Sequence, residues 1–269
     1  MYNPHLCNSR IARLIIIMDN ITEAEIKEKF RSAKNRLVLL DYDGTLVNHT
    51  PLPETAILPE HMSDIIIKLV DNPQTKIFII TGRGRSDIDK FLDHIPINII
   101  AEHGAMIKLE GVWKNQIINN FSWKKAILPV LKQITDACPE SYVEEKYFSL
   151  AWHYRNVDAD LGYSCSRELI HLLKGIIHSY NLRILDGNKV VEILTNETGK
   201  GSAVKKLFEQ QAYDFVLSIG DDATDEEMFE FFLNHQNAFT VKVGTGPTHA
   251  RYRLKSINEV ASLLNKLSG

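Results

Sequence analysis

The chain has 269 residues, of which 44% are hydrophobic, and its formal net charge is -3 at pH 7. This length and apolar content suit one large domain or two smaller ones, each with its own core. A slightly acidic chain is not typical of a nucleic-acid-binding protein. It also offers an anionic substrate no overall attraction, so any phosphate site must be local.

The cysteines and the N-terminal residues indicate the compartment. Cys7, Cys138 and Cys165 show no Cys-x-x-Cys spacing, which disfavours a zinc site or a disulfide framework and favours a reducing environment. The longest apolar run near the N-terminus, residues 14–18, is too short for a signal-peptide core or a membrane span. The sequence therefore predicts a cytoplasmic protein with no membrane segment.

The first part of the chain alternates between helical and strand-like stretches. Residues 1–30 are expected to form an N-terminal extension that leads into a charged amphipathic helix over 22–34. Short apolar runs without polar alternation are typical of strands buried on both faces of a parallel sheet. They span residues 36–40, 76–80, 97–101, 215–219 and 239–243. Helical stretches over 60–70, 84–93, 200–211 and 223–232 separate several of them, which predicts a Rossmann-like, doubly wound α/β core.

The middle of the chain breaks this alternation. A hairpin is expected over 108–115, with Glu110 and Gly111 at its turn. It is followed by a helix over 123–137, strands over 142–145 and 148–154, a helix over 164–180 and a hairpin around Asp186-Gly187-Asn188. This order predicts an α+β module over 118–195, inserted into a core made of 31–117 and 196–269. A module inserted beside the strand ends is a natural lid.

Polar side chains follow the apolar runs at the points where the predicted strands end. They are Asp41, Asp43, Thr81, Asp221, Asp222 and Asp225, and Lys200 stands between two glycines at the start of a helix. Ligands of parallel sheets bind beyond the carboxyl ends of the strands. Carboxylates gathered there repel one another unless a cation is present, and such oxygens suit Mg²⁺. A carboxylate can also attack phosphorus, and a lysine can offset phosphate charge.

The same residues carry a resemblance to a known family. Asp41-Tyr42-Asp43-Gly44-Thr45-Leu46 resembles the first motif of the haloacid dehalogenase-like phosphatases, D-x-D-G-T-L. Thr81-Gly82-Arg83, Lys200 and residues 220–225 resemble its later motifs in the same order. Further segments are similar to trehalose-6-phosphate phosphatases, namely 101–104, 143–146, 150–155, 189–192, 220–229 and 240–244. The resemblance covers roughly residues 36 to 265 and implies a haloacid dehalogenase-like core with an inserted C2B-type cap.

The resemblance also implies a reaction. Trehalose 6-phosphate would be hydrolysed to trehalose and phosphate through an aspartyl-phosphate intermediate, with Mg²⁺ as cofactor and trehalose-6-phosphate synthase as a possible partner. Asp41 would be the nucleophile and Asp43 the general acid and base, while Thr81 and Lys200 would hold the phosphate. The metal ligands would be the Asp41 side chain, the Asp43 carbonyl oxygen and Asp221, with Asp222 or Asp225 in support.

Substrate contacts are implied in the same way. Glu144, Lys146, Arg155 and Glu192 match cap positions that contact the sugar, and Arg83 and His103 match core positions near the cleft. One departure concerns Gly199, because the family often has Asn before the motif lysine.

Other interpretations stay open from the residues alone. A related enzyme of the same fold could act on sucrose phosphate or mannosylglycerate phosphate, and a phosphosugar mutase would release no phosphate. A non-catalytic sugar-phosphate sensor is favoured by loss of Asp41, Asp43 or Lys200, yet all three are present. A calcium loop starting at Asp41 would need Gly and Glu where Leu46 and Leu52 stand.

Overall fold

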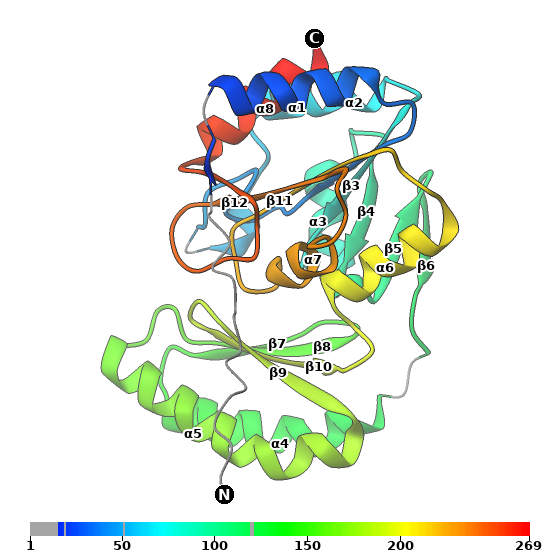
Figure 1. Ribbon diagram of the computed structural model, residues 1–269. Helices are drawn as coiled ribbons and strands as arrows, with labels where there is room; N and C mark the ends of the chain where they lie inside the picture. Colours follow the sequence, from blue (N-terminus) through cyan, green and yellow to red (C-terminus); the bar gives the residue numbers. More distant parts are fainter. Residues whose placement is uncertain (1–15, 19, 51, 119–120) are drawn as a thin grey trace, which may run out of the picture.

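The computed structural model describes residues 16–18, 20–50, 52–118 and 121–269. Two α/β bodies lie one above the other, with the larger at the top of Figure 1. The larger body, here called the core, contains a nine-stranded sheet in the order β1-β13-β12-β11-β2-β3-β4-β5-β6. Its strands are β1 (Ile16–Ile17), β2 (Arg36–Leu40), β3 (Thr75–Ile80), β4 (Asn98–Ala101), β5 (Met106–Leu109), β6 (Val112–Asn115), β11 (Phe215–Gly220), β12 (Ala238–Val243) and β13 (Tyr252–Leu254).

In the spatial order of this sheet, every strand from β1 through β13, β12, β11, β2 and β3 to β4 is parallel to its neighbour. The strands β5 and β6 extend the sheet beyond β4 as an antiparallel hairpin. Alternate residues of β2 enter two different apolar layers, Leu37 in one and Val38 in the other. The helices α1 (Asn20–Ser32), α2 (Glu60–Val70), α3 (Arg85–Leu92) and α8 (Ile257–Ser268) cover one face, while α6 (Lys200–Gln210) and α7 (Glu226–Phe231) cover the other. The predicted doubly wound α/β core is confirmed.

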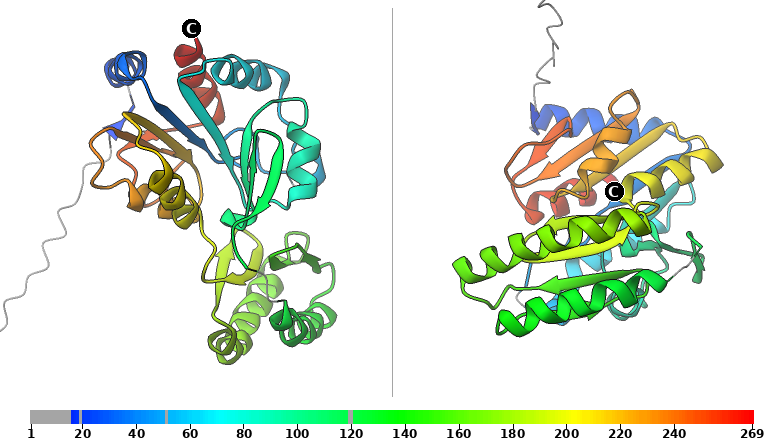
Figure 2. Two further views of the ribbon diagram at one scale, coloured as in Figure 1. Left: turned by 90° about the vertical axis from the view of Figure 1, so that its right-hand side faces the viewer. Right: turned by 90° about the horizontal axis from the view of Figure 1, so that it is seen from below.

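The smaller body, here called the cap, has a four-stranded antiparallel sheet in the order β7-β8-β10-β9. Its elements are α4 (Ser122–Ala137), β7 (Tyr142–Glu145), β8 (Ser149–His153), α5 (Ala159–Ile177), β9 (Leu182–Gly187) and β10 (Val190–Thr195). Both helices lie on the side of the sheet away from the core (Figures 1 and 2). Leu150 and Trp152 pack with these helices, so the residues that alternate with them face the core.

Several predicted element bounds need correction, and the causes are local. The helix predicted over 164–180 begins at Ala159, because the Asp158 side chain accepts hydrogen bonds from the Asp160 and Leu161 amides. The helix predicted over 223–232 is shortened to α7, since Asp222 holds a turn by accepting from the Asp225 amide. The helix predicted over 22–34 runs from Asn20 to Ser32.

The strands β1 and β13 and the helix α8 were not predicted from the sequence. For α8 a signal was present, because the Ser256 side chain accepts from the Glu259 amide and Glu259 accepts from the Lys255 amide, an N-terminal cap visible as Ser-x-x-Glu. Cys7 lies outside the described residues, whereas Cys138 and Cys165 are free thiols buried in the cap. Within the described part of the chain, no helix is both long and apolar enough to cross a membrane.

Candidate active site

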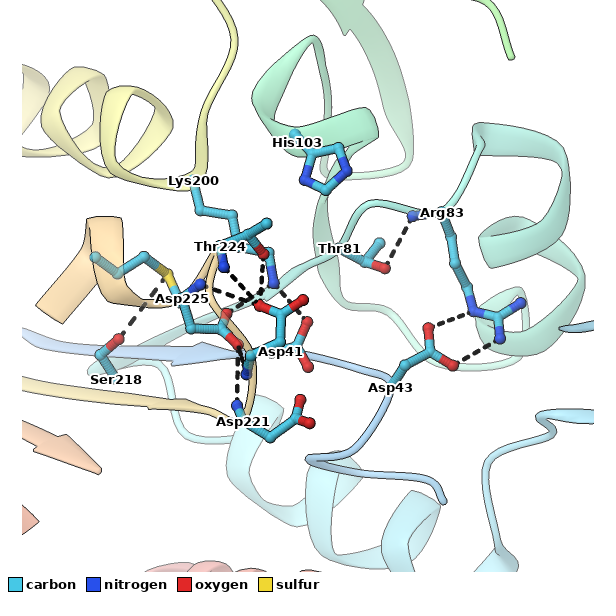
Figure 3. Close-up of polar contacts among 12 residues, drawn as sticks. Asp41, Asp43, Thr81, Arg83, His103, Lys200, Ser218, Asp221, Thr224 and Asp225 are labelled. Carbon is cyan, nitrogen blue, oxygen red and sulfur yellow. Dashed lines mark hydrogen bonds and ion pairs between the residues drawn. The ribbon is translucent and has the colours of Figure 1, made fainter. Parts of the chain in front are cut away.

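A buried lysine joins two carboxylates at the centre of the strand ends (Figure 3). Asp41 follows β2, and Lys200 begins α6 where the chain returns from the cap. The Lys200 Nζ atom donates to Asp41 Oδ1 and to Asp225 Oδ1, each at 2.7 Å. Burial lowers the pKa of Lys200, but Asp225 and Asp41 outweigh it and hold this pKa well above its usual value. Lys200 is therefore a permanent cation beside the expected nucleophile.

Asp225 organises the acidic loop after β11. Its Oδ2 atom accepts from the amides of Asp221 and Asp222, at 2.9 and 3.0 Å. Burial raises the pKa of Asp225 to about 7, and Lys200 opposes this shift. The chain can fold so tightly here only because Gly220 has no side chain, since a Cβ there would lie 2.2 Å from Asp225 Cγ. Asp225 thus positions both Lys200 and the loop.

The carboxylates around Lys200 fit a divalent cation. Oxygens of Asp41, Asp221 and Asp225 lie within 4.8 Å of one another. Asp41 Oδ2 and Asp221 Oδ1 are buried without a hydrogen-bond partner among the described residues, which is costly unless something else binds them. Burial and the charge of Asp225 also raise the pKa of Asp41 well above its usual value. A cation would remove both penalties.

Of the two aspartates expected in support of the metal, Asp222 and Asp225, only Asp225 belongs to the cluster of oxygen donors. Asp222 Oδ1 accepts from the amide and the hydroxyl of Thr224, at 2.8 and 2.7 Å. Gly44 allows Asp221 to approach the loop after β2, because a Cβ at Gly44 would lie 2.2 Å from Asp221 Oδ2.

The Asp43 carboxylate points away from Asp41 and towards Arg83 (Figure 3). Arg83 donates two hydrogen bonds to this carboxylate, from Nε to Oδ2 at 2.7 Å and from Nη2 to Oδ1 at 2.6 Å. The guanidinium also donates to the Pro53 carbonyl and lies over the Phe91 ring, at 2.9 and 5.2 Å. Arg83 therefore holds the Asp43 carboxylate in an orientation away from Asp41 in this structure.

The loop after β3 and the turn after β4 meet beside this pair. Thr81 Oγ1 accepts from the Arg83 amide at 3.1 Å and is almost fully buried. Glu102 and His103 both have left-handed backbones, with φ of 46° and 53°, which residues with side chains adopt at a cost. The imidazole of His103 lies so near Gly82 that a Cβ there would be 2.5 Å away. This strained turn delivers His103 into the cleft.

A buried ionic network joins cap and core above this loop. Glu192 accepts from Lys146 Nζ at 2.9 Å and from Ser149 Oγ at 2.5 Å, and its other oxygen lies 3.0 Å from His103 Nε2. Lys146 Nζ also donates to the Gly82 carbonyl at 3.0 Å. Burial alone would raise the pKa of Glu192. The charges of Lys146 and His103 outweigh burial and hold this pKa far below its usual range.

The two remaining cap residues expected at the site lie further out. Glu144 is 2.8 Å from His153 Nε2. Burial raises the pKa of Glu144, but this bond and the charge of Lys146 outweigh it and lower the pKa. Arg155 is exposed and donates to the Asn188 carbonyl at 2.8 Å.

A cavity of about 220 Å³ collects nearly all the expected site residues. Its lining includes Asp41, Asp43, Thr81, Arg83, His103, Glu144, Lys146, Arg155, Glu192, Lys200 and Asp222. His49, Thr50 and Val190 also line it but were not expected. His49 Nε2 lies 3.0 Å from Asp221 Oδ2, and it belongs to a loop whose sequence carries no recognisable motif.

A doubly wound core with reactive groups at its strand ends and a second α/β body over them is the arrangement of the haloacid dehalogenase-like hydrolases. A hydrolase of this class from B. subtilis shares the fold, with a TM-score of 0.59 at 15% identity over 85% of this chain and 98% of that one.

The comparison with family models narrows the class. The model for trehalose-phosphatase matches residues 39–258, and the chain belongs to this family. The C-terminal domain of C. albicans trehalose-6-phosphate phosphatase gives a TM-score of 0.88 at 26% identity, covering 95% of this chain and 99% of that one.

Similar relatives are longer proteins. A bifunctional trehalose-6-phosphate synthase/phosphatase from Thermoproteus tenax is 38% identical over 96% of this chain and 35% of its own length. A probable trehalose-phosphatase from Encephalitozoon cuniculi is 33% identical over 94% of this chain and 33% of its own length. The chain therefore spans about a third of the length of the curated relatives it matches.

Proposed function

We propose that this protein hydrolyses trehalose 6-phosphate to trehalose and phosphate through an aspartyl-phosphate intermediate. The observation that carries the proposal is the contact of 2.7 Å between Lys200 Nζ and Asp41 Oδ1, beside an Asp41 oxygen that has no partner within the described ranges. The expected nucleophile therefore lies beside a fixed cation at the strand ends, and one of its oxygens is available to bind a further group. Family membership supports the choice of reaction.

Mg²⁺ is the proposed cofactor. The side chains of Asp41 and Asp221 would hold it together with the main-chain carbonyl of Asp43, with Asp222 or Asp225 in support. Bound there, it would neutralise charge on the carboxylates and on the phosphate. Oxygen donors of this kind suit Mg²⁺.

The chemical steps use the chain's own groups. Asp41 attacks phosphorus in line, so that a bond from its carboxylate oxygen to phosphorus forms while the bond to the sugar oxygen breaks. Lys200 and Thr81 hold the phosphate oxygens as charge redistributes among them. Asp43 donates a proton to the departing sugar oxygen, and such general acid catalysis typically raises the reaction rate about 10²–10⁴-fold. Asp43 then takes a proton from the water that cleaves the aspartyl phosphate.

This sequence of steps requires Asp43 to turn. Its carboxylate is bonded to Arg83 and points away from Asp41. Rotation about the Cα–Cβ bond would bring it towards the leaving oxygen without moving the backbone that carries Asp41. Arg83 would receive the carboxylate again after product release.

Substrate choice would reside in the cap. Glu144, Lys146 and Glu192 would bond the sugar hydroxyls, and Arg155 and His103 would contact the substrate from either end of the cleft. A site built to bond hydroxyls rejects ligands that leave its polar groups unpaired. A trehalose-6-phosphate synthase activity would supply the substrate, as the name of the bifunctional relative suggests, and we expect the reaction to take place in the cytoplasm.

The test is phosphate release from a panel of sugar phosphates with and without Mg²⁺. Trehalose 6-phosphate should give the highest kcat/KM, ahead of sucrose phosphate and mannosylglycerate phosphate, and activity should vanish in EDTA. The Asp41→Asn variant should stay folded and lose turnover. Full activity of Asp41→Asn would exclude the covalent mechanism, and no preference for trehalose 6-phosphate would exclude the substrate.

A further inference from the structure

The cap sheet presents its cleft-facing side chains in rows, because its strands are paired in register. Glu144, Ala151 and Glu192 form one row across β7, β8 and β10. The row that follows towards the solvent consists of Tyr142, His153 and Val190. Side chains two residues apart on a strand point to the same face. Tyr142 therefore lies on the face that carries Glu144, yet the proposed chemistry gives it no role.

Tyr142 forms an ordered aromatic wall with His153. Their ring centroids are 4.7 Å apart and their planes differ by 16°. His153 Nε2 is in turn 2.8 Å from Glu144, so the two aromatic rings lie next to the carboxylates that are proposed to bind the sugar. Tyr142 is 45% exposed, which leaves it available to a ligand at the cleft mouth.

The two ends of the cleft differ in how they connect cap and core. At one end, Lys146 Nζ donates to the Gly82 carbonyl at 3.0 Å and the Phe148 amide donates to Glu102 at 2.6 Å. From the catalytic groups the cavity continues the other way, to His153 and Arg155. A ligand too long for the closed end would extend towards Tyr142.

The size of the cavity supports this direction. Its 220 Å³ is small beside ligand pockets of about 300–1,000 Å³. A phosphate with one hexose ring would occupy the interior, and a second ring would then lie at the mouth. The C–H face of a hexose packs well on an aromatic ring, while the tyrosine hydroxyl and Arg155 can bond its hydroxyls.

We propose that Tyr142, supported by His153, forms the subsite for the outer ring of a disaccharide phosphate. Tyr142 thereby selects disaccharide over monosaccharide phosphates. The proposal rests on the proposed function, since it concerns the same cleft.

The chain offers a matched control in the connection that follows the same strand. Tyr147 is 53% exposed and lines an adjoining cavity of about 570 Å³ together with Arg85 and Asn115; this cavity shares Glu144 and Lys146 with the first. If the outer ring occupied that cavity instead, Tyr147 would be the residue to contact it. Tyr142 and Tyr147 have similar exposure, so substituting each of them tests one of the two directions in which the outer sugar ring could extend.

The experiment measures kcat/KM for trehalose 6-phosphate and for glucose 6-phosphate in Tyr142→Ala, Tyr142→Phe and Tyr147→Ala. Where glucose 6-phosphate turns over too slowly, its Ki as a competitive inhibitor replaces kcat/KM. Tyr142→Ala should lower kcat/KM for the disaccharide about tenfold, equivalent to about 1.4 kcal/mol, mainly through KM. Glucose 6-phosphate should change by less than about twofold, because it lacks the outer ring. Tyr142→Phe should retain most of the activity, and Tyr147→Ala should leave both substrates unchanged.

The outcomes separate this inference from the proposed function. If wild-type protein prefers trehalose 6-phosphate but Tyr142→Ala affects both substrates equally or neither, the subsite is wrong and the function stands. A selective loss in Tyr147→Ala would place the outer ring in the larger cavity and refute the subsite. If the wild type does not release phosphate from trehalose 6-phosphate, the function itself fails. Should Tyr142→Ala fold poorly, Tyr142→Thr, which suits a strand, carries the same test.

Discussion

Replacing Lys200 with methionine tests the centre of the site through stability as well as through activity. The change keeps the side chain's length but removes the charge that lies 2.7 Å from both Asp41 and Asp225. Asp41 is 4% exposed and Asp225 is 0% exposed, so water cannot replace the ammonium. Breaking a buried ion pair by removing one partner costs about 3–5 kcal/mol. In EDTA we expect the free energy of unfolding of Lys200→Met to fall by this amount.

Urea denaturation monitored by circular dichroism measures the effect. Adding Asp225→Asn to Lys200→Met should recover part of the loss, because one of the two unpaired carboxylates is then neutral. Lys205→Met is the control, since Lys205 lies on the same helix but is exposed, and surface changes stay within about 0.5 kcal/mol. A loss below about 1 kcal/mol for Lys200→Met, or strict additivity in the double variant, would refute the electrostatic account. The kcat of Lys200→Met should fall about 10²–10³-fold, which is the usual cost of removing one donor that stabilises charge in the transition state.

Two further predictions concern the neighbouring ion pairs. Arg83→Met should lower kcat about tenfold with little change in KM, because Asp43 loses the partner that receives its carboxylate after each turnover, which affects the reacting groups rather than substrate binding; Arg85→Met, two residues further along at the start of α3, is the steady-state kinetic control, and equal effects of the two would exclude this role. Glu192→Gln should destabilise the protein at neutral pH. Its folded-state pKa is lowered, so its contribution is present above the unfolded pKa of about 4.3 and is lost as the pH falls towards the folded value. In urea titrations at several pH values, the stability gap between wild type and Glu192→Gln should therefore shrink below about pH 4, and a gap independent of pH would contradict the lowered pKa.

Much of the core was predictable because its strands are short apolar runs buried on both faces. The run 36–40 and the helix 60–70 agree with β2 and α2 to the residue. The convergence of Asp41 and Lys200 was predictable too, because parallel strand ends and the helices that follow them share one edge of the sheet.

Side-chain partners were less predictable, since they depend on distant backbone positions. The pairing of Asp43 with Arg83 joins residues 40 apart, and neither periodicity nor motif specifies which way the Asp43 carboxylate turns. The roles of Asp222 and Asp225 depend on a single turn in which Asp222 bonds Thr224 while Asp225 bonds Lys200. Sequence indicates acidic residues in such a loop but does not rank them as ligand or support.

The hinge between cap and core suggests how sugar recognition is coupled to the reacting groups. Arg183 of β9 donates to Glu227 of α7 at 2.6 Å, and Glu227 also accepts from the Gly201 amide at 3.2 Å. A side chain at Gly199 would lie 2.4 Å from the same carboxylate, so the glycine before Lys200 makes room for this contact. Cap position is therefore linked, through Arg183 and Glu227, to the first turn of α6. Because that turn carries Lys200, these contacts connect the cap sheet to the residue that places the cation beside Asp41.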